Sequence, residues 1–318
     1  MARVVLQRVL QSLPTLFFLT FLSFGLMQIV PGGPAVIMLG NNATPQLIAQ
    51  LNRSMGLNKP IYVQYAIWLE HLFHGNLGYA YTQHASVLSL IGQNLPRTLI
   101  LVLSAIILSH AISIWLGVLQ ATRHSTRRDH AISVGTYFFY CMPVFWLGIM
   151  VVAIFAVDLR WFPAGGISNP LSTGSSVAGY IDHMFLPVVV LVIGTVAGWT
   201  RFVRGSMVET LDQDYIRTAR AKGISELRVF YVHALRNSVI PLITLAGMSL
   251  PGLFSGALII EMIFNYPGMG LLFWNAAQQR DYPVLMAVVL MVGVLGILGN
   301  LLADLLYAMV DPRIRYSR

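Results

Sequence analysis

Residues 98–119 read TLILVLSAIILSHAISIWLGVL, a run that contains no Asp, Glu, Lys or Arg. A helix needs about 20 apolar residues to cross the roughly 30 Å hydrocarbon layer of a bilayer. The apolar residues of this run are continuous and do not alternate with polar ones, which indicates a helix rather than a strand of a membrane barrel. The run therefore predicts one membrane-spanning helix.

Five further runs have the same character, so the predicted fold is an all-α integral membrane protein with six transmembrane helices. The other runs are residues 9–30, 131–157, 183–199, 238–264 and 284–309. The whole chain of 318 residues is 56% hydrophobic and only 10% charged, whereas soluble domains carry about 25% charged residues. With a mean hydropathy of +0.70, this composition excludes a soluble enzyme, a disordered chain and a nucleic-acid-binding domain.

The distribution of basic residues predicts the orientation of the spans. With the N-terminus inside the cell, six spans return the C-terminus to the inside. Of the 20 Lys and Arg residues, five then lie outside and all the others inside; the five are Arg53, Lys59, Arg97, Arg160 and Arg280. Cytoplasmic loops carry an excess of Lys and Arg, so the bias supports N-in/C-in topology and explains the net charge of +8 without a nucleic acid. Residues 28–31, QIVP, lack the small residues of a signal-peptide cleavage site.

Prolines and glycines interrupt several of the predicted spans. Pro143 and Pro187 fall in the third and fourth spans, and Pro241 and Pro251 fall in the fifth. Proline removes a backbone donor and kinks a helix. The fifth span also contains the small-xxx-small pattern Gly252–Gly256, which lets helices approach closely. These features are consistent either with simple packing irregularity or with helices that rearrange.

A long segment, residues 31–97, separates the first two spans on the predicted outer side. Residues 61–73 have the pattern of an amphipathic helix that contains Tyr65 and Trp68, residue types that favour the membrane interface. Residues 75–78, GNLG, break this helix, and helical periodicity resumes near Val87. The segment is either an interfacial cap or a docking surface for an external partner.

The segment 204–236 on the predicted inner side has the signals of two short helices joined by a tight turn. Asp212 is a candidate cap for a helix through Tyr215 to Lys222, and Gly223 is placed to end that helix in a left-handed conformation. Ser225 is a candidate cap for the second helix. Ala219, Ala221 and Gly223 would leave the tip slim enough to enter a groove on another protein. The alternative is a basic hairpin that only enforces topology.

The same segment resembles a known family. Residues 214–223, DYIRTARAKG, followed by HALRN at 233–237 and by Ile240-Pro241, resemble the cytoplasmic coupling loop of binding-protein-dependent ABC importer permeases, and more narrowly the peptide-importer subfamily. Further matches occur along the whole chain, at residues 31–34, 56–60, 75–78, 94–98, 267–270, 280–283 and 311–313. The broad permease consensus has Glu-Ala-Ala where this chain has Arg217, Thr218 and Ala219. This departure bears on which subfamily the chain resembles, and not on its resemblance to the family.

The resemblance implies a division of labour among subunits. Two similar permeases form the path, two ATPase subunits inside bind ATP and magnesium, and a binding protein outside delivers a peptide. This chain would be one permease in a bacterial or archaeal plasma membrane, with 1–97 as first helix and outer cap and 98–318 as permease core. It lacks a Gly-x-x-x-x-Gly-Lys-Ser/Thr loop, so it is expected to be no enzyme and to hold no cofactor itself. The residues expected to contact an ATPase subunit are Asp214, Tyr215, Ala219, Arg220, Ala221, Lys222 and Gly223.

Polar residues in or near the apolar spans are candidates for the path or gate. Ionisable residues there are costly and usually face protein or water. Glu261 could line the path or brace the outer side, and Asn300 and Asp304 are further candidates, although Asp304 could simply pair with an arginine. His110 is expected to pack between helices. His71 and His74 have a spacing able to bind metal, but without a third ligand no metal site is predicted, and the single cysteine, Cys141, excludes a Cys cluster.

Other functions stay open at this point. Peptide-type permeases also serve nickel and glutathione systems. A gradient-driven secondary transporter would favour paired inverted repeats, and an intramembrane enzyme would need a catalytic pair; neither feature is evident in the sequence.

Overall fold

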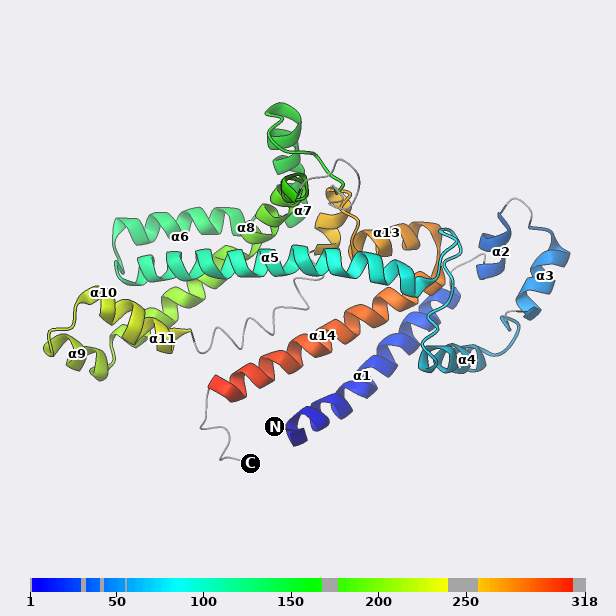
Figure 1. Ribbon diagram of the computed structural model, residues 1–318, viewed down its shortest axis with the longest axis horizontal. Helices are drawn as coiled ribbons and strands as arrows, with labels where there is room; N and C mark the ends of the chain where they lie inside the picture. Colours follow the sequence, from blue (N-terminus) through cyan, green and yellow to red (C-terminus); the bar gives the residue numbers. More distant parts are fainter. Residues whose placement is uncertain are drawn as a thin grey trace. The chain divides into compact units, whose positions relative to one another are not determined.

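The computed structural model describes residues 2–29, 33–40, 43–54, 56–167, 177–239 and 257–310. Within these ranges the chain is helical and contains no β-strand, only an isolated bridge between Tyr79 and Ser86 (Figure 1). The chain divides into two compact units: unit 1 is Met1–Thr98 with Pro267–Leu298, and unit 2 is Leu99–Tyr266 with Gly299–Arg318. The functional division at 97/98 expected from the sequence stays a prediction.

Unit 1 is built on the first helix and the segment that follows it. Its elements are α1 (Ala2–Ile29), α2 (Gly33–Leu39), α3 (Pro45–Ser54), α4 (Ile61–Phe73), α13 (Met269–Gln279) and parts of α5 (Val87–Ala121) and α14 (Tyr282–Val310). The predicted helix at 61–73 is confirmed as α4, and helical structure resumes at Val87 as expected.

The amphipathic face of α4 packs on α1 through Tyr65. This side chain is 4% exposed, and its hydroxyl shares a 2.8 Å hydrogen bond with the Thr20 hydroxyl. Its ring meets the edges of Phe17, Phe21 and Phe24 at centroid distances of 5.7, 5.3 and 5.5 Å. Edge-to-face aromatic contacts add to the burial of apolar area, so α4 is held as a fixed part of unit 1.

The loop before α5 is tied to the corner between α13 and α14. Asp281 is fully buried, and its Oδ2 accepts hydrogen bonds from the Thr82 backbone N–H and hydroxyl, both at 3.0 Å. Burial first, and then the nearby Asp281 carboxylate, raise the pKa of Tyr81 to about 12. These hydrogen bonds join residues that are about 200 positions apart in the sequence. The segments 75–78 and 280–283, two of those that resemble the permease family, also meet here, because Gly78 lies against Pro283.

Unit 2 gathers the central helices. Besides the rest of α5 it contains α6 (Arg127–Tyr140), α7 (Val144–Val151), the π-helix η2 (Val152–Asp158), α8 (Val177–Leu211) and a helix at 257–263. They are followed in Figure 1 by the short helices α9 (Asp214–Ala221), α10 (Glu226–Arg228) and α11 (Leu235–Ser238), with the π-helix η3 (Val229–Ala234) before α11. One apolar core surrounds the middle of α8, and a second lies between its C-terminal part, α5 and the short helices.

Four described helices are long and apolar enough to span a membrane: Leu10–Gln28, Val87–Ala121, Val177–Leu211 and Tyr282–Leu302. They correspond to the first, second, fourth and sixth predicted spans. The fifth predicted span, with Pro241, Pro251 and the Gly252–Gly256 pattern, lies mostly outside the described residues, at 240–256. The count of six and the N-in/C-in topology therefore stay predictions.

The third predicted span, 131–157, is broken near Pro143, one of the prolines expected to interrupt a span, and its two helices together are long and apolar enough for one span. Arg127–Tyr140 and Val144–Asp158 meet at an angle of 94°. Pro143 precedes the second helix with ψ 132°, an extended conformation that a helix cannot contain. The proline also lacks the N–H that would continue the first helix, so the chain turns sharply and resumes at Val144.

Candidate functional site

The candidate site is the hairpin formed by α9, the turn at residues 222–225 and α10. The helix α9 follows α8 after only Asp212 and Gln213. Gln213, with φ −72° and ψ 147°, occupies the N-cap and its side chain makes no capping hydrogen bond, so the predicted cap at Asp212 was wrong by one residue. Asp214 lies in the first turn, where a carboxylate interacts favourably with the positive end of the helix dipole.

Gly223 ends α9 as predicted. Its φ is +74°, in the left-handed region that glycine adopts without the Cβ penalty. The Gly223 N–H donates to the Arg220 carbonyl at 2.9 Å, and the Ile224 N–H donates to the Ala219 carbonyl at 3.3 Å. This pair of bonds is the Schellman pattern, which satisfies carbonyls that the helix end would leave free. The predicted left-handed turn is confirmed, and the chain direction reverses within a few residues.

The two faces of α9 have different surroundings. Ile216 and Ala219 are 0% and 6% exposed, and they pack in one apolar cluster with Val203 and Met207 of α8. The cluster also contains Val118 and Ala121 of α5 and Val229 and Ala234 of η3. Ala219 was expected at the exposed tip; instead its small side chain allows close packing of α9 on its own chain.

The opposite face of α9 is exposed and polar. It consists of residues that the sequence singled out, together with two neighbours: Asp214, Tyr215, Arg217, Thr218, Arg220, Ala221, Lys222 and Gly223. The cationic residues outnumber the acidic one, so the face would suit a surface with negative charge or free carbonyl groups. The face is therefore an exposed polar surface with a net positive charge.

Polar contacts hold the hairpin in shape. Arg220 donates to the Glu226 carboxylate at 2.9 and 3.3 Å across the turn. Both side chains are largely exposed, so this ion pair stabilises the hairpin by about 1 kcal/mol or less. Asn237 donates to the Tyr215 hydroxyl at 2.9 Å and so links α9 to α11.

A second contact joins α11 to α8. The Ser238 hydroxyl donates to the Ala234 carbonyl at 2.9 Å and makes a 3.0 Å hydrogen bond with the Thr210 hydroxyl, while the Ser206 hydroxyl donates to the Ser238 carbonyl at 3.1 Å. Ser225 occupies the N-cap of α10 as expected, without a capping hydrogen bond from its side chain. Sequence reasoning missed Ser206, Thr210 and Ser238, since only the fold brings them together.

The candidate path residues occupy different environments. Glu261 is fully buried in the helix at 257–263, beside Ile260 of the core around α8. Asn300 is exposed on α14, and the side chain of Asp304 lies outside the described residues. Their assignment to a path stays a prediction.

The histidines are placed as helix-surface or packing residues. His110 packs its ring 4.4 Å from that of Trp199, and its Nδ1 lies 2.8 Å from the Ile106 carbonyl oxygen. On α4, His74 Nδ1 lies 2.8 Å from the Glu70 carbonyl oxygen. In the described part of the chain, no three His, Cys, Asp or Glu side chains gather as a metal site would require.

Comparisons with known proteins agree with this architecture. The family model described as "Binding-protein-dependent transport system inner membrane component" matches residues 113–316, and the model of its N-terminal part matches residues 1–102. The oligopeptide transport system permease protein AppB of Bacillus subtilis is 42% identical over 317 residues, which cover 99% of this chain and 100% of that protein. The di/tripeptide transport system permease protein DppB of Pseudomonas aeruginosa is 36% identical over an alignment 324 positions long, which covers 96% of this chain and 96% of that protein.

A solved structure supports the fold independently. A chain from the inward-facing MetNI methionine ABC transporter superposes with a TM-score of 0.57, covering 70% of this chain and 97% of that one. The two sequences are 15% identical, so the likeness concerns the fold alone. Taken with the family match over most of the chain, these findings show that the protein is a multi-pass membrane protein that belongs to the family of binding-protein-dependent transport system inner membrane components.

Proposed function

We propose that this chain is the permease subunit of an ABC importer and that it forms part of the membrane path for peptides delivered by an external binding protein. The observation that carries the proposal is full-length similarity, at 42% and 36% identity, to permeases named for oligopeptide and di/tripeptide transport. The absence of a phosphate-binding loop from the sequence fits a subunit that takes its energy from a partner.

The exposed face of α9 is the proposed docking site for an ATPase subunit. Its exposed cations, Arg217, Arg220 and Lys222, lie on a short helix whose opposite face is buried in its own unit. A rigid helix seated in a partner's groove can transmit a displacement, whereas a flexible loop would dissipate it. This assignment places α9 in the cytoplasm, with both chain termini, in agreement with the distribution of Lys and Arg.

The segment 31–97 is the proposed docking surface for the binding protein on the outer side. Tyr62 and Phe73 of α4 are 67% and 84% exposed, while Tyr65 fixes the same helix on α1. Exposed aromatic side chains on a fixed helix are typical of a surface that another protein covers.

The proposed assembly contains four kinds of component. This chain pairs with a second, homologous permease; two ATPase subunits bind ATP and magnesium; and one binding protein carries the peptide. The complex would reside in the plasma membrane of a bacterium or archaeon, and Glu261, Asn300 and Asp304 stay candidates for the path.

Uptake measurements in a deletion strain test the substrate. Loss of the gene is expected to abolish accumulation of labelled di- to oligopeptides, because the complex has no path without this subunit, and a plasmid copy should restore it. Uptake of radioactive nickel and of glutathione is measured in the same cells. Normal peptide uptake with loss of nickel or glutathione uptake alone would contradict the assignment to peptides.

A further inference from the structure

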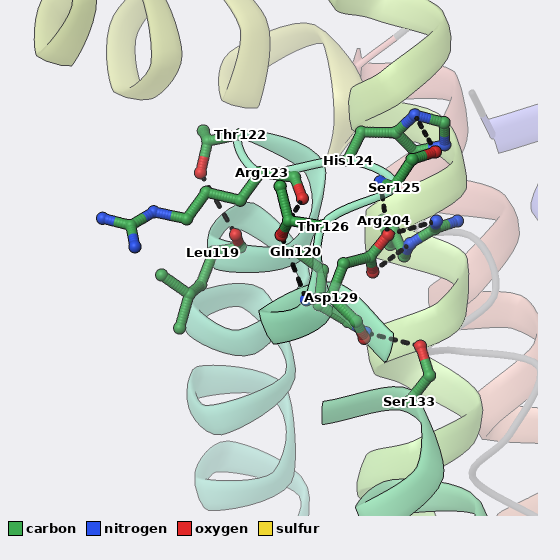
Figure 2. Close-up of polar contacts among 10 residues, drawn as sticks. All are labelled: Leu119, Gln120, Thr122, Arg123, His124, Ser125, Thr126, Asp129, Ser133 and Arg204. Atoms are coloured by element: carbon green, nitrogen blue, oxygen red, sulfur yellow. Dashed lines mark hydrogen bonds and ion pairs between the residues drawn. The ribbon is translucent and has the colours of Figure 1, made fainter. Parts of the chain in front are cut away.

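An ion pair between the buried side chain of Asp129 and the 29% exposed side chain of Arg204 joins α6 to α8 on the same stretch of α8 that supports α9. Asp129, in the first turn of α6, is 1% exposed. Its Oδ1 accepts from Arg204 Nε at 2.8 Å, and its Oδ2 accepts from Arg204 Nη2 at 2.7 Å (Figure 2). The Oδ2 atom also accepts from the Ser125 backbone N–H at 3.0 Å. Two parallel bonds between guanidinium and carboxylate fix orientation as well as distance.

The end of α5 is joined to the same point. The Gln120 side chain is 2% exposed, and its Nε2 donates to the Asp129 carbonyl at 3.2 Å and to the Ser133 hydroxyl at 2.8 Å. Figure 2 shows these groups converging from the end of α5, the start of α6 and α8. We call Gln120, Asp129 and Arg204 the clamp. Its hydrogen bonds join α5 to α6 through Gln120 and α6 to α8 through Arg204.

The clamp and α9 both contact the same stretch of α8. Val203, next to Arg204, is fully buried, as is Met207 one turn further along. Both pack in the cluster that contains Ile216 and Ala219 of α9, together with Val118 and Ala121 of α5. A displacement of α9 therefore reaches Val203 and Arg204 through packed side chains, with no flexible segment in between.

The ion pair between Asp129 and Arg204 contributes little to the free energy of unfolding, but it constrains how α6 and α8 are oriented. Desolvation of the buried Asp129 carboxylate offsets much of its attraction to Arg204, so the pair adds little net stability. Removing Arg204 would leave the buried Asp129 carboxylate without its cation. The pair therefore matters chiefly because it holds α6 in one position relative to α8.

We propose that the clamp is a positioning element for transport: it carries the movement of α9 along α8 to α5 and α6, so that ATP binding in the partner changes the path. The proposal rests on the proposed docking of α9 to an ATPase subunit. In this proposal the clamp residues contact neither ATP nor peptide; they act through the helices that they hold together.

The test uses the complete complex, purified and reconstituted in proteoliposomes with its binding protein. Asp129→Asn keeps the shape of the side chain and removes its charge. Arg204→Lys keeps the charge and removes the pair of guanidinium N–H donors that bind Asp129. For each variant the amount of assembled complex, the basal ATPase rate, the ATPase rate with loaded binding protein and peptide uptake are measured. Arg128→Gln, a charge loss at an exposed neighbour of Asp129, is the matched control.

Asp129→Asn is expected to assemble and to keep its basal ATPase rate, while stimulation by the loaded binding protein and uptake per complex fall about tenfold. Arg204→Lys is expected to lose less of the stimulation and of the uptake than Asp129→Asn, because lysine keeps the positive charge. The double variant Asp129→Asn with Arg204→Gln should be no worse than Asp129→Asn alone or Arg204→Gln alone, because both substitutions act on one contact.

Wild-type stimulation in assembled Asp129→Asn complex would overturn the proposal. Loss of uptake only in proportion to loss of assembled complex, in Asp129→Asn and Arg204→Lys alike, would overturn it too, because the pair would then be structural. Failure of the proposed function itself would look different: the wild-type complex would show no ATPase stimulation by the loaded binding protein.

Discussion

Replacing Gly223 by aspartate is expected to leave the chain in the membrane but to reduce uptake by about 100-fold or more, the size of loss expected at a central interface residue. A Cβ at this position would meet no atom within 4 Å in this chain, so the substitution creates no clash inside the protein. Aspartate also accepts the left-handed conformation better than most residues. The variant should therefore fold, and its defect should arise at the partner's surface.

Two features of Gly223→Asp act against docking. The side chain projects from the tip of the hairpin, where the partner is proposed to approach, and its negative charge lies beside the negative end of the α9 dipole. Gly223→Asn has the same shape without the charge, and Gly223→Ala adds the Cβ together with the strain that a side chain meets at a φ of +74°. We expect uptake to follow the order Gly, Ala, Asn, Asp, measured in proteoliposomes. Wild-type uptake in the aspartate variant would show that the tip of the hairpin is not a docking surface.

The second large effect is expected at Gly117, where α5 crosses α8. A Cβ there would lie 2.5 and 2.6 Å from Val203 Cβ and Cγ1 and 3.1 Å from the Arg204 backbone nitrogen. Real Cβ atoms do not approach so closely, and Val203 is fully buried and has no room to move aside. Gly117→Val should therefore separate α5 from α8 and pull Arg204 away from Asp129.

We expect Gly117→Val to lower the melting temperature of the purified complex by about 5 °C and to abolish uptake, since overpacking against a buried side chain and backbone costs about 1–3 kcal/mol and occasionally more. The control is Gly135→Val on α6, where nothing lies within 4 Å of the added Cβ. Thermal unfolding in detergent compares the two. Equal melting temperatures for both variants would show that the close approach of α5 and α8 is not required.

The features that were predictable from the sequence depend on local pattern. Long apolar runs mark spanning helices because a membrane requires internal backbone hydrogen bonding over a fixed thickness. The helix at 61–73 was predictable from its amphipathic pattern, and the turn at Gly223 from the ability of glycine to adopt positive φ. The spacing of Ile216 and Ala219, three residues apart on one helix face, could also have indicated that Ala219 is buried.

The features that sequence reasoning missed depend on tertiary contacts. Pro143 marks a possible break, but the 94° angle depends on what each half-helix packs against. Asp129 and Arg204 are 75 residues apart, and each lies among other charged residues, so nothing local pairs them. The only local signal was Asp129, which directly follows the basic stretch 123–128. Sequence reasoning used that stretch only to assign the topology.

Site-specific photocrosslinking tests the central claim, that α9 docks on an ATPase subunit. A photoreactive amino acid is placed at the exposed Ala221 of α9 and, as a control, at the exposed Val134 of α6, in cells that produce the whole complex. Illumination is predicted to join position 221 to an ATPase subunit, in an adduct with the combined mass of the two chains, and to give none from position 134. A complex that imports peptide normally but yields no ATPase adduct from position 221 would contradict the account.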